Sequence, residues 1–469
     1  MKQAAWLGFS IDRRANVPVF EQICTGIRAA IISGDLVPGS RLPATRVFAT
    51  ELGLSRSTVV TAYEQLVAEG YLHSLQGSGY TVCALGEVEL AGAEPAAEIL
   101  DERPGAEMQN PGLAMPFESG QPDMRLFPHR QWAKTVSRVC RTNPEAMLIG
   151  GGPFGNIELR RTIAAHVAEW RGIQASAHQV IVTAGSADAL DICVRGLTQK
   201  GEGVGIESPG YRPICHFAEA QGLAPDWLEI GAHGAELPKS KPAPRLVFLT
   251  PSHQYPLGGA MSPSRRLEFI NWAAASDAWI IEDDYDSEFR YAGRPIPAMA
   301  GFDKLNRTIY IGSFSKIFSN SLRLGYIVAP DVVLDRLRAA IRQTGLRASY
   351  MPQQALAEFM ESGEFYRHLR RMRRIYAERR GFLLGRLARD FAQFGRFDDH
   401  QAGMQVVFHL TGGHRDSDIV QRASQAGIET EALSECAFVP GDHNGLILGF
   451  CGYEISVMEA ALGVLRRCF

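Results

Sequence analysis

The chain has 469 residues, enough for about three domains or for one large α/β unit with an appendage. It is 46% hydrophobic and 21% charged, as ordinary globular proteins are, and its formal net charge of -3 excludes a generally basic surface for nucleic acid. The eight cysteines form no CxxC pair, which argues against a zinc site or a disulfide framework. No apolar run suits a signal peptide or a membrane span, so the sequence predicts a soluble, cytoplasmic protein.

Residues 13–83 have the pattern of a small helix-turn-helix unit with a β-hairpin. The expected elements are helices over 19–32, 47–52 and 56–69 and strands over 71–73 and 80–82. Gly53 makes the turn between the second and third helices, and Ser55 is placed to cap the third helix. In this arrangement the third helix is the one that enters the major groove of DNA.

The third helix carries polar side chains on its leading turn, where a recognition helix contacts phosphates and base edges. The candidate DNA-binding residues of the unit are Arg46, Ser55, Arg56, Ser57, Thr58, Gly77 and Gly79. The alternative is a small packing domain, because residues 1–83 carry seven basic and six acidic side chains, a net charge of only +1. A single unit with that charge would bind double-stranded DNA feebly, so DNA binding implies a homodimer.

Residues 84–112 predict a flexible acidic linker. They contain seven Asp or Glu residues against the single Arg103, with Ala, Gly and Pro between them. A segment of this composition cannot bury a core, and as a coil it would span roughly 30 Å on average.

From residue 113 to residue 469, apolar strand-like runs alternate with helical stretches. The runs are 180–182, 204–206, 246–249, 279–281 and 308–311, and polar residues follow each of them. This rhythm is typical of a mostly parallel sheet with crossover helices, and we expect the polar residues to converge on one crevice at the carboxyl ends of the strands. A long charged helix over 363–386 and a smaller α+β part should end the chain.

The residues around Lys316 combine an amine, hydroxyl groups and a guanidinium. Ser313 and Ser315 come just before Lys316, and Arg323 follows seven residues later. This set suits a phosphorylated aldehyde, because Lys forms a Schiff base while Ser and Arg hold phosphate oxygens. That description fits pyridoxal 5'-phosphate, whose enzymes also need a carboxylate at the pyridine nitrogen, and the acidic run 282–284 offers one. A lysine after a serine is more often a solvated loop residue, but the acidic strand end and Arg323 favour the cofactor.

Two resemblances fit these patterns. Motifs in residues 42–46 (Leu-Pro-Ala-Thr-Arg), 52–59, 62–63, 69–70 and 77–79 resemble the winged helix of GntR-type bacterial repressors. Residues 113–469 resemble a class I aminotransferase of fold-type I, and the whole chain looks like a MocR-type transcriptional regulator. The implied fold is an N-terminal winged helix-turn-helix followed by an α/β, pyridoxal-phosphate-dependent aminotransferase-like domain that also dimerises.

The resemblance assigns roles to several residues near Lys316. Lys316 would be the Schiff-base lysine, Asp283 the partner of the pyridine nitrogen and Tyr285 the partner of the phenolic oxygen. Phosphate ligands are expected at Gly185, Ser186, Ser313, Ser315 and Arg323. Tyr211 falls where an aromatic ring stacks on the cofactor, with a packed loop aromatic as the alternative.

The expected arginine for a ligand carboxylate is missing. Aminotransferases, and the γ-aminobutyrate-responsive members of the regulator group, hold that carboxylate with arginine, but the chain has no Lys or Arg between Arg422 and Arg466. The positions where such residues are expected hold Ala437, Ile447 and Pro213. We therefore expect an effector other than γ-aminobutyrate, with His253 or Arg212 as possible substitutes for the arginine.

The sequence thus predicts a dimeric transcriptional regulator that binds double-stranded DNA and pyridoxal 5'-phosphate. Its effector is expected to be an amine or amino-acid-like molecule that reacts at Lys316, or pyridoxal 5'-phosphate itself. The alternative from another class is a working aminotransferase with an accessory DNA-binding head.

Overall fold

The chain divides into two units, Met1–Glu107 and Met108–Phe469. The computed structural model describes residues 11–15, 17–75, 79–84, 115–145, 149, 151–293, 295–345, 348–439 and 441–469. Each unit has its own apolar core. The predicted linker over 84–112 lies outside the described residues except at its first position, so it stays a prediction.

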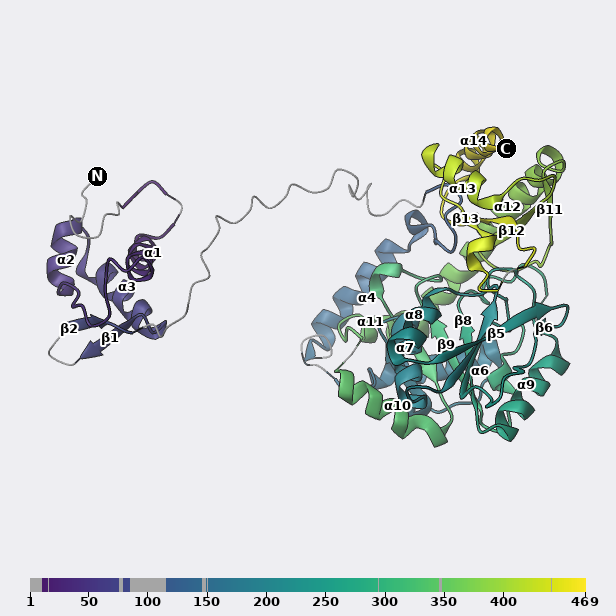
Figure 1. Ribbon diagram of the computed structural model, residues 1–469, viewed down its shortest axis with the longest axis horizontal. Coiled ribbons are helices and arrows are strands. Elements are labelled where there is room, and N and C mark those ends of the chain that lie inside the picture. Colours follow the sequence, from purple (N-terminus) through teal and green to yellow (C-terminus); the bar gives the residue numbers. More distant parts are fainter. Residues whose placement is uncertain are drawn as a thin grey trace. The chain divides into compact units, whose positions relative to one another are not determined.

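The smaller unit has three helices and a two-stranded antiparallel sheet, drawn in purple in Figure 1. The elements are α1 (Val19–Ile32), α2 (Thr45–Leu52), α3 (Arg56–Ala68), β1 (Leu72–Leu75) and β2 (Gly79–Val82). The predicted helices are confirmed, although α2 begins two residues earlier than expected. Gly53 ends α2 with φ of 63°, a left-handed conformation that glycine adopts without strain. Ser55 caps α3 by accepting a hydrogen bond of 3.1 Å from the Thr58 backbone N–H.

Apolar side chains from all three helices form the core of the smaller unit. Phe48 of α2 and Tyr63 of α3 are fully buried, with ring centroids 6.0 Å apart. The Tyr63 hydroxyl donates to the backbone oxygen of Pro43 at 3.2 Å. On the surface, the Arg28 guanidinium makes two hydrogen bonds of 2.7 and 3.0 Å to Glu69, which join α1 to the end of α3. The buried Tyr63 ring and the surface contact of Glu69 with Arg28 therefore fix the orientation of α3.

An eight-stranded sheet forms the centre of the larger unit, in the order β3-β10-β9-β8-β7-β4-β5-β6. Its strands are β3 (Val180–Thr183), β4 (Gly203–Ser208), β5 (Ala224–Gly231), β6 (Gly234–Ala235), β7 (Leu246–Leu249), β8 (Trp279–Asp284), β9 (Thr308–Ser313) and β10 (Gly325–Val328). The strands β9, β8, β7, β4 and β5 are neighbours in that order and pair in parallel, while β10 is antiparallel to both β3 and β9. The predicted mostly parallel sheet is confirmed.

Helices cover both faces of this sheet (Figure 1). The helices of this part of the chain are α4 (His129–Thr142), α6 (Ile157–Arg171), α7 (Ser186–Leu197), α8 (Pro213–Gln221), α9 (Pro263–Ala275), α10 (Asp331–Thr344), α11 (Gln353–Glu361) and α12 (Glu364–Asp390). Successive strand residues point to opposite faces, so Ile281 of β8 packs in one cluster with α7, α8 and α10 while Ile280 packs with α9. Strands buried on both faces read as continuous apolar runs, which explains why five of them were predictable.

A smaller α+β part follows α12, as predicted. Its sheet has the order β11-β12-β14-β13, and α13 (Asp416–Gln425) and α14 (Ile455–Leu465) accompany it. The strands are β11 (Gly395–Phe397), β12 (Gln405–Leu410), β13 (Glu431–Ala432) and β14 (Gly445–Gly449). The helix predicted over 363–386 extends to Asp390.

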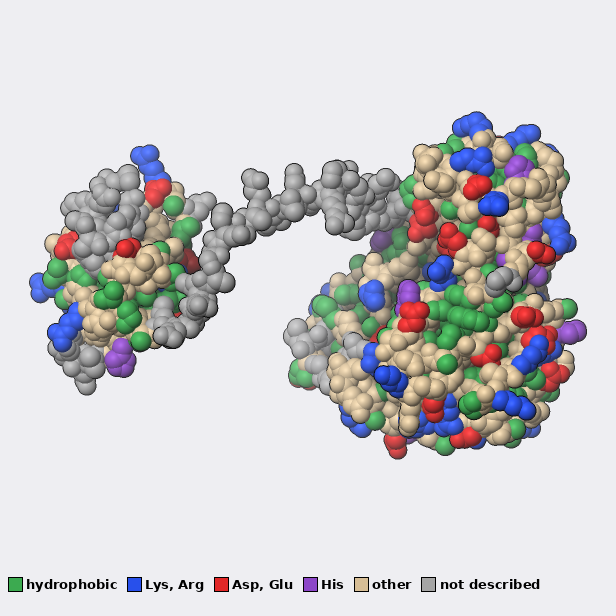
Figure 2. Space-filling model, in the orientation of Figure 1, with side chains coloured by type: hydrophobic (Ala, Val, Ile, Leu, Met, Phe, Trp, Pro, Cys, Tyr) green, Lys and Arg blue, Asp and Glu red, His purple; other side chains and the backbone are tan. Residues whose placement is uncertain are grey.

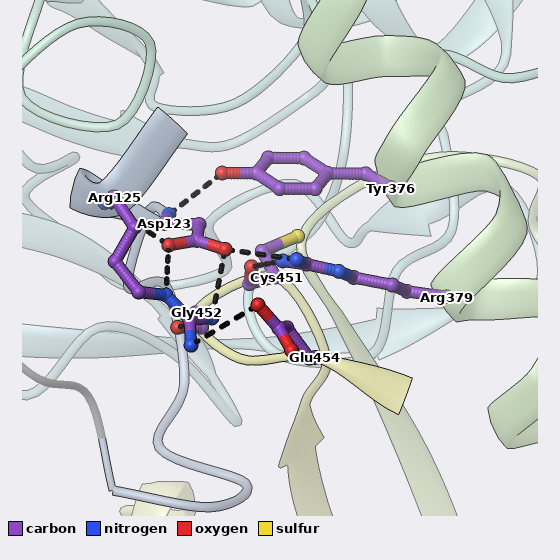
Figure 3. A network of polar contacts seen from close by, with 7 residues as sticks. All are labelled: Asp123, Arg125, Tyr376, Arg379, Cys451, Gly452 and Glu454. Carbon is purple, nitrogen blue, oxygen red and sulfur yellow. Dashed lines mark hydrogen bonds and ion pairs between the residues drawn. The ribbon is translucent and has the colours of Figure 1, made fainter. Parts of the chain in front are cut away.

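A buried polar network ties the first described segment of the larger unit to α12 and to the loop after β14 (Figure 3). Asp123, 3% exposed, accepts hydrogen bonds from Arg125 at 2.8 and 2.9 Å and from Arg379 at 2.8 Å. Tyr376 and the backbone N–H of Asp123 lie 2.9 Å apart, and Arg379 also donates to the Cys451 carbonyl. Burial alone would raise the pKa of Asp123, but the two arginines outweigh it and the pKa is lowered.

Basic and acidic side chains are interspersed over the visible face of the larger unit (Figure 2). Among the described residues, no helix has the length and apolar character needed to cross a membrane.

Candidate functional site

A cavity of about 300 Å³ lies where β8 and β9 end and α7 begins. Its lining residues are Ser119, Gly120, Ser186, Tyr211, Arg212, Pro213, Thr250, Tyr255, Asp283, Tyr285, Lys316, Gln405, Glu431 and Cys436. Five of the predicted cofactor residues are among them: Lys316, Asp283, Tyr285, Tyr211 and Ser186. The expected convergence at the carboxyl ends of the strands is therefore observed for these five residues.

Lys316 follows β9 by three residues and extends its amine into this cavity. Burial lowers the pKa of Lys316, and the surrounding carboxylates, Asp286 and Glu431 first among them, oppose that shift only in part. Gly120 lies against the amine: a Cβ built on Gly120 would come 2.8 Å from the Lys316 Nζ, and its φ of +63° is also suited to glycine. An amine with a lowered pKa is more often neutral, which is the nucleophilic form.

Asp283, the fifth residue of β8, has one carboxylate oxygen without a partner among the described residues. Its Oδ1 is buried and makes no hydrogen bond to any described residue. Burial, followed by the charges of Asp284 and Asp286, raises the pKa of Asp283 to about 7. A cationic N–H group placed at this oxygen would satisfy it and restore the ionised form, so the site fits a protonated pyridine nitrogen.

Tyr285 is fixed by residues behind the cavity. Its hydroxyl lies 2.9 Å from the Nδ1 of His253, and the same nitrogen is 2.9 and 3.1 Å from the Asp286 carboxylate. His253 is 4% exposed and does not line the cavity. It therefore positions Tyr285 and is poorly placed to replace the missing carboxylate-binding arginine.

The other expected phosphate ligands are Gly185, Ser313, Ser315 and Arg323, and they do not line this cavity. Strand pairing nevertheless brings the turn at Gly185 close to Ser313. Gly325, the first residue of β10, pairs with Thr183 on one side and with Ser313 on the other. A Cβ on Gly325 would come 2.8 Å from the Gly185 carbonyl carbon, so the turn before α7 lies close to β10. Ser315 follows Ser313, donating its backbone N–H to that hydroxyl at 3.2 Å. The start of α7 thus faces the strand ends that carry Ser313, with free N–H groups suited to an anion.

Arg323 adds an exposed guanidinium to this region. Its backbone is left-handed, with φ of 46°, and its side chain makes no hydrogen bond to the described residues. Strained non-glycine positions of this kind concentrate at functional sites.

Tyr211 lies at the mouth of the cavity and is 37% exposed. Its ring meets Tyr255 edge-on at 5.8 Å, and Tyr255 in turn meets Tyr285 edge-on at 5.9 Å. A stacking role for Tyr211 stays a prediction.

Sequence analysis missed several lining residues, of which Ser119, Gln405 and Glu431 are the most polar. The Tyr255 hydroxyl donates to Glu431 at 3.0 Å, and the Ser119 hydroxyl donates to the other oxygen of the same carboxylate. Gln405 is 5% exposed, and its side-chain nitrogen has no partner among the described residues. The stretch 423–465 contains no Lys or Arg, and no local motif distinguishes Glu431 within it.

The positions expected to hold a carboxylate-binding arginine prove apolar in three dimensions as well. Pro213 lines the cavity, while Ile447 is fully buried and pairs with Glu431 across β13 and β14. The Glu431 carboxylate therefore lies beside Ile447, one of the positions where an arginine was expected. Arg212, which also lines the cavity, is exposed and donates to the Glu435 carbonyl at 3.0 Å.

The candidate DNA-binding surface is on the smaller unit. Arg46, Arg56 and Ser57 are exposed, whereas Thr58 is half-buried. The Ser55 hydroxyl caps α3 and makes contacts of 2.8 and 2.7 Å with the hydroxyls of Ser57 and Thr58, so its role in DNA binding stays a prediction. Gly79 opens β2 with φ of 88°, and Gly77 lies outside the described residues.

Two protein families match the chain. Residues 20–82 match "Bacterial regulatory proteins, gntR family", and residues 115–428 match "Aminotransferase class I and II".

Several curated proteins are similar along most of their length. The "probable rhizopine catabolism regulatory protein MocR" of Rhizobium meliloti is 37% identical over 98% of this chain and 95% of its own. The "HTH-type pyridoxine biosynthesis transcriptional regulator PdxR" of Corynebacterium glutamicum is 32% identical over 94% of both chains. Among solved structures, the α-aminoadipate aminotransferase LysN of Thermus thermophilus is 25% identical with a TM-score of 0.68, over 76% of this chain and 92% of that one.

Proposed function

Because this chain belongs to the MocR-type transcriptional regulators, which join a GntR-type winged helix to an aminotransferase-like domain, we propose that a small amine or amino-acid-like effector binding beside Lys316 changes how its winged helices bind DNA. The chain is a transcriptional regulator, and pyridoxal 5'-phosphate is the cofactor that its larger domain implies. A regulator of bacterial genes of this kind would act in the cytoplasm, where the chromosome is.

The cofactor supplies an aldehyde that accepts amines. Lys316 would hold it covalently, Asp283 would keep its ring nitrogen protonated, and Tyr285 would hydrogen-bond its phenolic oxygen. Ser186 at the start of α7, with Gly185, Ser313, Ser315 and Arg323, would bind the phosphate. The observation that carries this proposal is the unpartnered Asp283 oxygen, which shares one cavity with the lowered-pKa amine of Lys316.

Absorption spectroscopy tests the proposal. The purified protein should show a visible band from the covalently held cofactor, and Lys316→Ala should lose that band while keeping the circular dichroism spectrum of the wild type. Lys304→Ala, which removes an exposed lysine in a loop before β9, should keep the band. A band that survives in Lys316→Ala would show that another residue holds the cofactor.

Direct sensing of the cofactor is the second candidate. The resemblance to a regulator of pyridoxine biosynthesis and the lack of a carboxylate-binding arginine near Glu431 favour it. The two candidates differ in a DNA-binding titration: cofactor alone changes the operator affinity in the second, whereas the first requires an added amine.

A further inference from the structure

We propose that one wall of the effector cavity selects an amine whose far end carries hydroxyl or ammonium groups, and that it disfavours a carboxylate there. The wall consists of Ser119, Tyr255, Gln405 and Glu431, and we call it the acidic wall. The inference rests on the proposed function, since it takes the reacting amine to lie at Lys316.

Strand pairing places the members of the acidic wall on one face of the smaller sheet. Gln405 of β12 pairs with Gly449 of β14, and Glu431 of β13 pairs with Ile447 of the same strand. Positions 447 and 449 are two residues apart, so they and their partners point to the same side. Gln405 and Glu431 therefore flank β14 on the side that faces the cavity.

The segment that carries Ser119 closes the wall against Lys316. A Cβ on Gly449 would come 2.0 Å from the Glu118 carbonyl oxygen and 3.0 Å from the Ser119 Cα, so only glycine lets this segment lie over β14. Ser119 binds Glu431, and the next residue, Gly120, lies against the Lys316 amine. A ligand whose reacting amine lies beside Lys316 would therefore have the acidic wall within reach.

The Glu431 carboxyl has no cation at bonding distance in the part of the chain that the structure describes. Its two hydrogen bonds come from neutral hydroxyls, those of Tyr255 and Ser119. Among the described residues, no lysine, arginine or histidine nitrogen forms an ion pair with it. Burial first, and then the charge of Glu431, raises the pKa of Tyr255, which keeps the phenol protonated as a donor. Each carboxylate oxygen can accept a further hydrogen bond, so a ligand donor would be accommodated.

Gln405 supplies an independent observation. Its side chain is buried and lines the cavity, yet its amide nitrogen has no partner among the described residues. Buried amide groups are almost always hydrogen-bonded, so the unpartnered nitrogen of this lining residue is consistent with a ligand oxygen beside it. A hydroxyl group satisfies both sides of the wall, because it can donate to Glu431 and accept from Gln405.

A carboxylate in the same place would meet the charge of Glu431. Arg212 is the guanidinium that lines the cavity, but it is exposed and already bonded to the Glu435 carbonyl. The acidic wall thus reverses the charge preference expected of a site for amino acids.

Matched four-carbon amines test the inference on the full-length protein loaded with cofactor. The probes are 4-aminobutyrate, 1,4-diaminobutane, 4-amino-1-butanol and butylamine, and dissociation constants come from calorimetry, with the visible band as a second readout. The diamine and the amino alcohol should bind at least about tenfold more tightly than 4-aminobutyrate, the size expected for one charge-assisted hydrogen bond.

Glu431→Gln should weaken binding of the diamine by at least about tenfold and bring the affinity for 4-aminobutyrate closer to the affinities for the other amines. The reason is that the substitution removes the charge and keeps the shape of the side chain. Glu429→Gln, which changes an exposed carboxylate two residues earlier, should leave the order unchanged. If Glu431→Gln fails to fold, the ranking in the wild-type protein still decides.

Equal or tighter binding of 4-aminobutyrate in the wild type would overturn the inference, as would an unchanged order in a folded Glu431→Gln variant. In both cases a change of the visible band on adding amines would leave the proposed function standing. Absence of any heat or spectral change with all four amines would overturn the inference and the amine-sensing proposal together.

Discussion

Asp283 illustrates how a single side chain is prepared for a ligand. One oxygen of its carboxylate is buried without a partner, and burial with two neighbouring carboxylates raises its pKa to about 7. Keeping such a group charged in the cofactor-free protein costs stability, which a cationic ring nitrogen would restore. The residue that recognises the cofactor is thus also the residue that lowers the stability of the cofactor-free protein.

The cofactor-free protein should become less stable as pH rises from about 4 through 7, because the folded state holds a proton on Asp283 that the unfolded chain releases near the ordinary aspartate pKa of 3.8. A raised pKa of this size corresponds to at most about 4 kcal/mol at about 1.4 kcal/mol per unit. Asp283→Asn should therefore stabilise the cofactor-free protein at pH 8 by roughly 2–4 kcal/mol and change it little below pH ~4. Urea unfolding at the two pH values measures this.

Asp277→Asn is the control, because the pKa of Asp277 is shifted in the opposite direction. Hydrogen bonds from Arg245 and Arg307 lower the pKa of this exposed carboxylate to about 2, so its removal should bring no gain at pH 8. A cofactor-free Asp283→Asn variant that is less stable than the wild type at pH 8 would contradict the assignment of a costly buried charge.

At the scale of elements, α3 is held firmly while its leading turn stays exposed. The Ser55 cap and the Arg28–Glu69 ion pair secure its two ends, and Tyr63 anchors its inner face. Arg56 is then presented on a rigid helix, as recognition by an inserted helix requires.

Arg56→Ala should weaken binding to the operator by roughly 1–3 kcal/mol if Arg56 contacts a base edge. Arg14→Ala removes the same charge from an exposed position before α1 and should weaken binding less. Fluorescence anisotropy with labelled operator DNA, at one fixed salt concentration, compares the variants. Equal losses for the two variants would mean that Arg56 contributes only its charge.

The Asp123 network joins three elements that lie far apart in the sequence (Figure 3). The pKa of Asp123 is lowered in the folded state, so its contribution to stability is present above the usual carboxyl pKa of about 3.9 and is lost as pH falls through the lowered value. Asp123→Asn should cost about 3–5 kcal/mol at pH 7, because the buried Arg379 loses its counter-charge. The cost should shrink at pH ~3.

Unfolding free energies at the two pH values test this dependence. Asp335→Asn, which removes a fully exposed carboxylate 3.7 Å from Arg338, should change stability little at either pH. A cost for Asp123→Asn that does not depend on pH would assign the effect to packing instead of charge.

At the scale of the whole molecule, DNA binding must be reconciled with the weak charge of the smaller unit. Residues 1–83 carry a net charge of +1, and two such units bound together would double the number of phosphate contacts. A homodimer through the larger unit would supply this.

Footprinting should therefore show two half-sites in one promoter, and light scattering should show a dimer at the concentrations that protect them. The larger unit alone, residues 108–469, should still dimerise without binding DNA. A monomer that protects one half-site with full affinity would contradict the dimer.

The sequence by itself determined many of the elements of both units and the reacting lysine of the site. Three helices of the smaller unit, five strands of the large sheet and the position of Lys316 follow from periodicity, caps and residue types that act within a few residues. The choice of Asp283 within the acidic run 282–284 came from the family resemblance. Strands β5, β6 and β10 of the large sheet were not predicted; β5 is largely exposed and β6 spans only two residues.

The tertiary structure alone decided which wall faces Lys316. Ser119, Lys316 and Glu431 are more than a hundred residues apart, and they meet because the chain closes over Gly449 and because β13 pairs with β14 in one register. A one-residue shift of that register would turn Glu431 away from the cavity. Packing across the small sheet sets the register, and no local pattern in the sequence records it.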